Sequence, residues 1–322
     1  MSDKNPDKTR NSIIDLLRII LVVLVVNIHV RIISGGKENF LEPYTWYAVP
    51  LFIIISFFFF KNKSLIVKIK RLCVPLIFWS AVGFIIHPNL VNVKNIFLQL
   101  LTGQIVNTPL YYLILLAWFI VIYWLIDLFA SSLKVSIYFW IILIALFLEY
   151  SRINFIFFVS LNEAVFYCYG RFVELIKYVP IGLTFAFLKK KTANNNLFLV
   201  LSVIFLPIYV VVSNISQPSG FYYSGLKILV GSIIIFSLVL GLSNFKFSNK
   251  VNSVINLLGK YSFGVYLSHI LLLEIILKIN PPLKLLINLY QIPFLFFYVT
   301  SCYLFCFLFD FVTLKKLSFL VK

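Results

Sequence analysis

Long apolar runs recur along the whole chain, separated by short polar connections. A helix that crosses a bilayer needs about 20 mostly apolar residues. The runs therefore predict an all-α membrane protein of about ten transmembrane helices, at residues 13–33, 43–60, 72–88, 110–129, 135–150, 165–188, 196–213, 222–242, 256–278 and 289–314. The sixth segment interrupts its apolar residues with charges, Pro180 and Gly182. We expect it to be a broken helix, or a short re-entrant piece followed by a short helix.

Composition supports this class of fold. Hydrophobic residues make up 61% of the chain and charged residues only 12%, whereas soluble domains carry about 25% charged residues. The mean hydropathy is +1.00. The longest polar connection, roughly 89–109, is too short for an appended soluble domain. We therefore expect residues 1–322 to form a single transmembrane domain, whose first apolar run is an uncleaved helix because it is longer than a signal-peptide core.

The net charge of +17 would suit nucleic-acid binding, but the distribution of the basic residues indicates membrane topology instead. If the N-terminus is cytoplasmic, about two thirds of the 28 Lys and Arg residues fall at cytoplasmic ends and loops, as in Lys68–Arg71 and Lys189–Lys191. Cytoplasmic loops of membrane proteins carry this excess. We therefore expect both termini in the cytoplasm, the lipid bilayer as a partner and no nucleic-acid partner.

The first helix carries ionisable residues that an ordinary membrane anchor avoids. Asp15 and Arg18 lie three residues apart near its start, and His29 follows 11 residues after Arg18. Eleven residues complete about three helical turns, so Arg18 and His29 share one stripe of the helix, roughly 16 Å apart along its axis. Ionisable groups inside a membrane usually face a protein interior or a wet cavity. Two interpretations are open: a functional site, or an ion pair at the headgroups with His29 at the opposite interface.

The sequence contains no grouping that favours a metal. Its three histidines form no ligand cluster, and no Cys-x-x-Cys is present. Cys302 and Cys306 lie four residues apart on one helix face, a spacing for which packing in the core is the favoured interpretation. We expect neither a metal nor a bound cofactor.

Several segments, taken together and in order, resemble the acyltransferase-3 family of integral membrane acyltransferases. Asp15-Leu-Leu-Arg18 followed by ten residues and His29 is similar to the family's Asp-x-x-Arg and Arg-x10-His motifs. Val49 to Ser56 is similar to its second helix, although Phe57 stands where the family commonly has glycine. Lys70-Arg71 before Pro75 is similar to its third-helix basic pair. Leu258 to His269, which contains Ser262, Tyr266 and a Tyr-Leu-x-His ending, is similar to its late-helix signature.

The resemblance implies transfer of an acyl group, usually acetyl, from acyl-CoA to a hydroxyl of a cell-surface glycan or lipid-linked sugar, in the cytoplasmic (inner) membrane of a bacterium. Such a reaction needs a base for the hydroxyl proton and positive charge or donors for the developing oxyanion. His29, with an ordinary pKa of about 6.5, is the expected base, or else a covalent carrier of the acyl group. Arg18, held by Asp15, is expected to bind CoA phosphate or to orient the thioester.

Other polar residues allow two interpretations each. Lys70 and Arg71 are either phosphate partners for CoA or ordinary cytoplasmic charge. Ser262, Tyr266 and His269 form a polar stripe that is either a wall of the site or interhelical glue. Arg171 and Glu174 either line a cavity for the acceptor or form a structural ion pair.

Two non-acyltransferase functions also fit a multispan membrane protein. A polysaccharide flippase or other transporter would show scattered intramembrane charges, but it often has internal repeats, and none is visible here. A polysaccharide polymerase or ligase would be expected to carry a large outer loop, which the sequence does not contain.

Overall fold

The computed structural model describes residues 11–35, 39–60, 65–86, 110–129, 133–150, 163–192, 194–215, 223, 225–314 and 316–321. Within these ranges the chain is helical and contains no β-strand, as the all-α prediction requires. The principal helices are α1 (Ser12–Ser34), α2 (Glu42–Thr45), α3 (Ala48–Phe58), α4 (Leu65–Ile86), α6 (Tyr111–Phe129), α7 (Lys134–Tyr150), α9 (Glu163–Ile176), α10 (Tyr178–Lys191), α11 (Asn196–Ser213), α12 (Gly225–Gly241), α13 (Asn249–Ile279), α14 (Leu283–Leu289) and α15 (Gln291–Val312). The polar connection at 89–109 lies outside the described residues.

Seven of the described helices are long and apolar enough to cross a membrane. They are α1, α4, α6, α11, α12 with the 3₁₀ turn Leu242–Asn244 that extends it, α13 and α15. This supports a multi-pass membrane protein. Helices α3, α7 and α10 are shorter than an 18-residue window, so the expected count of ten spans stays a prediction.

Two of the expected helices are divided, and proline explains both divisions. The single helix expected at 43–60 is wrong, because α2 ends before Trp46 and α3 begins after Tyr47. The sixth segment breaks at Lys177, as expected for a broken helix. Proline has no N–H to donate to the carbonyl four residues earlier. For Pro50 and Pro180 those carbonyls lie at the two breaks, so each proline occupies the first turn of the next helix.

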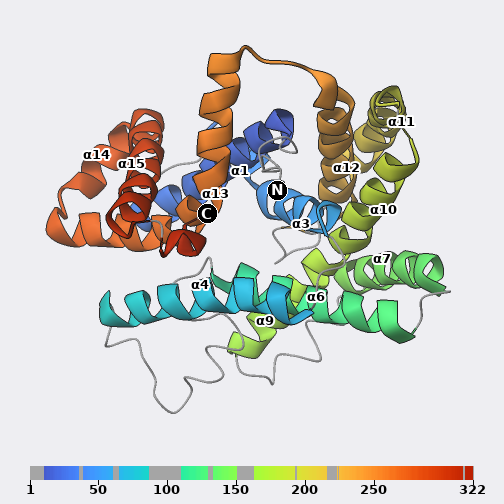
Figure 1. Ribbon diagram of the computed structural model, residues 1–322, viewed down its shortest axis with the longest axis horizontal. Helices are drawn as coiled ribbons and strands as arrows, with labels where there is room; N and C mark the ends of the chain where they lie inside the picture. The colour runs from blue at the N-terminus through green and yellow to red at the C-terminus, as the bar shows by residue number, and fades with distance from the viewer. Residues whose placement is uncertain are drawn as a thin grey trace, which may run out of the picture.

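Figure 1 shows α13 at the centre of the molecule, with α14 and α15 on one side and α10, α11 and α12 on the other. Helix α1 packs along α13, α3 packs along α10, and α11 packs along α12. Helices α4 and α6 contact each other and lie side by side below α13 in this view. The core thus joins the first helix of the chain to helices near its end.

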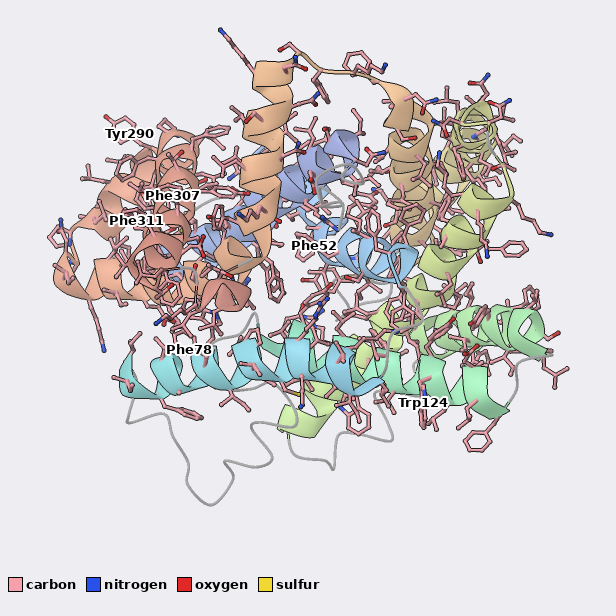
Figure 2. The ribbon with its side chains drawn as sticks, in the orientation of Figure 1. Phe52, Phe78, Trp124, Tyr290, Phe307 and Phe311 are labelled. Atoms are coloured by element: carbon pink, nitrogen blue, oxygen red, sulfur yellow. The ribbon has the colours of Figure 1, made fainter. Side chains whose placement is uncertain are left out.

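Large apolar side chains cover the outer surfaces of the helices. Trp124 on α6 and Phe307 and Phe311 on α15 are exposed, and Figure 2 labels their places on these helices. A contiguous apolar surface of this extent would be a liability in water. Such an apolar surface is typical of helices that face lipid tails.

Candidate active site

Local sequence fixes the ends of α1, which carries Arg18 and His29. The side chain of Asn11 caps the start of the helix by accepting from the backbone N–H groups of Ile13 (3.0 Å) and Ile14 (3.3 Å). The helix ends at Gly35, whose φ of +71° is a left-handed conformation that glycine adopts without strain. Between these caps an unbroken helix holds Arg18 and His29 on one stripe.

Helices α1 and α13 approach each other closely at Gly259. A Cβ atom on this residue would lie 2.7 Å from the Cβ and 2.8 Å from the Cγ of Asp15, which no ordinary side chain could tolerate. Gly259 is the second residue of the segment that resembles the late-helix signature. Its missing side chain lets the two backbones approach, and this approach places the polar stripe of α13 beside the stripe of α1.

Arg18 is held in place by two contacts. One guanidinium nitrogen donates to Oδ1 of Asp15 at 2.9 Å, and the side chain of Asp15 is 3% exposed. The guanidinium carbon also lies 5.3 Å from the centre of the Phe59 ring on the chain just after α3. The side chain of Arg18 remains 29% exposed, so it is oriented by protein groups but still open to a ligand.

A cavity of about 270 Å³ opens beside Arg18, between α1, α3, α6 and α13. Its polar wall consists of Arg18, Ser56, Tyr112, Lys260, Ser262 and Tyr266. Three of the residues expected at the site, Arg18, Ser262 and Tyr266, are therefore brought together. Two cations on one wall favour an anionic ligand.

Aromatic rings form part of the same wall. Phe52 lies near the centre of the molecule in Figure 2, and its ring packs against the rings of Tyr112 (6.4 Å) and Tyr266 (5.7 Å). The hydroxyl of Ser56 donates to the carbonyl of Phe52 at 2.8 Å. Because Ser56 has one proton, the 3.2 Å contact with the hydroxyl of Tyr112 requires Tyr112 to donate. The tyrosine is thereby fixed at the cavity.

His29 and His269 meet at the α1–α13 contact. Their ring centroids lie 5.1 Å apart, with an angle of 51° between the ring planes. His269 is fully buried, whereas His29 is half-buried. Tyr266 links the pair to the cavity, because it lines the cavity and its ring lies 6.1 Å from that of His269. The structure thus joins the histidines of the two most distant motif segments.

Lys70 and Arg71 lie apart from this cluster. Both are exposed on α4, and neither is among the residues that line the cavity. Pro75 lies inside the same helix and cannot donate to the carbonyl of Arg71. The basic pair therefore sits on helix surface next to an unsatisfied helix turn, accessible to an anion from outside the bundle.

Arg171 and Glu174 form a separate buried cluster on α9. One guanidinium nitrogen of Arg171 lies 2.7 Å from Oε2 of Glu174, and its guanidinium carbon lies 5.1 Å from the centre of the Tyr223 ring. Close by in sequence, Lys177 forms a fully buried ion pair with Glu149 of α7. The second oxygen of Glu149 accepts from the backbone N–H of Gly225 at 3.1 Å. These contacts support the interpretation of Arg171 and Glu174 as an ion pair.

Sequence reasoning missed several of these residues. Tyr112 gives no signal in the sequence, because it belongs to an apolar run. Lys260 gives no signal of its own in the sequence, because it belongs to the general excess of basic residues, although its position beside Gly259 places it on the cavity wall. Glu149 is an acid within an apolar helix, which could have identified it as the partner of Lys177. Cys302 and Cys306 lie in the core, as expected.

Lys177→Met should destabilise the protein by about 3–5 kcal/mol, because it leaves the Glu149 carboxylate buried without its cation. Thermal unfolding in detergent measures this loss. Adding Glu149→Gln should restore most of the stability, since the uncompensated charge is then gone.

Lys284→Met is the matched control. Lys284 is exposed on α14, so its loss should change stability by no more than about 0.5 kcal/mol. A double variant that is less stable than Lys177→Met alone would show that the ion pair is not the source of the effect.

Comparison with known families agrees with the geometry. No curated protein and no solved structure matches the chain. The sequence model of the acyltransferase-3 family, described as an acyltransferase domain, matches residues 11–311. The match covers nearly the whole chain and includes all four helices that line the cavity. The protein therefore belongs to the acyltransferase-3 family and is a multi-pass membrane protein with an acyltransferase domain.

Proposed function

We propose that the protein transfers an acyl group, acetyl in the first instance, from acyl-CoA to a hydroxyl of a cell-surface glycan or lipid-linked sugar. The observation that carries the proposal is the cavity between α1 and α13, which has cations on its wall. A pair of histidines lies next to Tyr266, one of the residues that line this cavity. A transporter needs neither a base nor an acyl-CoA site. The family assignment favours the acyltransferase.

The proposed topology has ten membrane crossings in a single domain, with both termini in the cytoplasm. It puts the protein in the cytoplasmic membrane of a bacterium. Support comes from the seven long apolar helices and from the cytoplasmic bias of the basic residues. In this orientation Arg18 lies on the cytoplasmic side of His29. A cytosolic donor and an acceptor on the outer side then approach the same helix from opposite ends.

The donor would be bound through its anionic and amide groups, with no cofactor bound permanently. Arg18 and Lys260 supply positive charge in the cavity, and Lys70 and Arg71 supply it on the surface of α4. The cavity of about 270 Å³ lies just below the usual range for small-molecule sites, roughly 300–1,000 Å³. It therefore suits one part of acyl-CoA, the pantetheine arm, rather than the whole molecule.

His29 would be the catalytic base. It takes the proton of the acceptor hydroxyl while the hydroxyl oxygen attacks the thioester carbonyl carbon. The carbon–sulfur bond then breaks, and the CoA thiolate leaves with the proton from His29. Arg18 lies roughly 16 Å from His29 along α1, so its part is to hold the donor and not to touch the reacting carbonyl. Arg171 and Glu174 form an ion pair beside Tyr223, and this pair as a unit is the proposed contact for the acceptor.

His29→Ala should lower acetyl transfer about 100-fold or more, because a positioned general base contributes roughly 10²–10⁴-fold. The assay follows label from radiolabelled acetyl-CoA into the lipid-linked glycan fraction of membranes that contain the protein. His87 is the third histidine of the chain and has no proposed role in the reaction, so His87→Ala is the matched control and should keep full activity. Transfer at the wild-type rate by folded His29→Ala protein would overturn the assignment of the base.

Arg18→Ala should weaken acetyl-CoA binding about 10- to 100-fold, the effect of losing a charged hydrogen-bonding partner worth about 1.5–3 kcal/mol. Calorimetry on purified protein measures this, with Arg71→Ala as a second variant and Lys250→Ala as an exposed control on α13. Weakening by Arg71→Ala as well would assign the basic pair to the donor phosphates. Absence of binding by folded wild-type protein would contradict the donor site.

A further inference from the structure

The two histidine rings lie at the spacing of a hydrogen-bonded pair. Two imidazoles joined by an N–H···N bond have centroids about 5 Å apart, the sum of one bond length and two ring radii. The centroids of His29 and His269 are 5.1 Å apart. No hydrogen bond joins the two rings in this structure, because Nδ1 of His269 is engaged with the Val265 carbonyl and its Nε2 has no partner among the described residues. Rotation of the half-buried His29 ring, rather than movement of either helix, is what would form one.

The protonation of the His269 ring follows from its surroundings. Its Nδ1 lies 3.1 Å from the carbonyl oxygen of Val265, one turn earlier in α13. A carbonyl can only accept, so Nδ1 carries the hydrogen. In the neutral ring Nε2 is then a bare acceptor. It is buried and has no hydrogen-bond partner among the described residues. An unpaired buried acceptor is destabilising, and each such group calls for an explanation.

Other nearby polar groups are already engaged. The hydroxyl of Tyr298 donates to the backbone carbonyl of His269 itself. The hydroxyl of Ser268 lies 3.9 Å from the sulfur of Cys306 and so points toward α15. The ring that packs directly against His269 and carries an N–H of suitable chemistry is His29.

We propose that His269 is a positioning residue, whose Nε2 accepts an N–H from His29 and so fixes the tautomer of the catalytic base. The other ring nitrogen of His29 is then the lone pair that faces the acceptor hydroxyl. Which nitrogen of a histidine carries the proton is set by the hydrogen bond of the other. When His29 takes the hydroxyl proton, His269 stabilises the resulting imidazolium as an acceptor and gains no proton itself. The inference rests on the proposed function of His29.

The test reads the tautomers directly. The chain contains only three histidines, so ring-nitrogen NMR of histidine-labelled protein gives a spectrum that single variants assign. In the wild type, His269 should have a protonated Nδ1 and an unprotonated Nε2, and His29 should populate one tautomer. A wild-type spectrum with His269 protonated on Nε2 would overturn the proposal, whatever the variants do.

Three variants separate a positioning role from a structural one. His269→Leu should convert His29 to a mixture of tautomers and lower kcat about 10- to 100-fold, the effect of removing a group that orients an imidazole, with KM for acetyl-CoA unchanged. His269→Gln places an amide oxygen near the site of Nε2, so it should keep the His29 tautomer and much of the activity. Ser268→Ala, equally buried on the same helix, should alter neither.

An unchanged His29 tautomer in His269→Leu would leave His269 a packing residue and contradict the inference. The spectra also keep this proposal distinct from the proposed function. If the spectra agree with the pairing but His29→Ala still transfers acetyl, the function fails and the pairing stands.

Discussion

The close approach of α1 to α13 at Gly259 is the contact on which the rest of the site depends. Asp15 occupies the space that a side chain at Gly259 would need. The ion pair between Asp15 and Arg18 is held at this point, and the two histidines meet farther along the same pair of helices. Packing of small residues, rather than hydrophobic burial, is what brings helices together in a lipid environment. The close approach at Gly259 therefore helps to place both the cavity and the histidine pair along these two helices.

Charges inside the bundle serve two purposes, and their surroundings distinguish them. The pair of Glu149 and Lys177 is fully buried, and Glu149 has a further backbone donor, so its contacts are complete. This is the arrangement of a structural pair that cannot lose one partner. Arg18 is instead partly exposed on the wall of a cavity. Its ion pair orients the guanidinium and leaves part of it open to a ligand, which is what a binding site requires.

Much of the architecture could be read from the sequence, because apolar length and intramembrane charge are strong signals. The stripe of Arg18 and His29 follows from helical spacing alone, and the family resemblance added His269 as a candidate. Sequence could not pair the two histidines, since that contact depends on how distant helices pack. The sequence analysis also predicted one helix where the structure has α2 and α3. Hydropathy carries no information about the backbone hydrogen bond that Pro50 cannot donate. Tyr112 was invisible because its role arises only from the neighbours that α6 acquires in the fold.

Cross-linking in native membranes is the measurement that shows whether α1 and α13 bring the two histidines together. In a chain without its native cysteines, His29→Cys and His269→Cys are combined and treated with a short bifunctional thiol reagent. We expect an intramolecular link that holds the two halves of the chain together after proteolysis. We expect none for His29→Cys with Ser253→Cys, a position about 24 Å along α13 from residue 269. Failure of the 29–269 pair to link, although both cysteines react with a monofunctional reagent, would show that the two histidines do not meet.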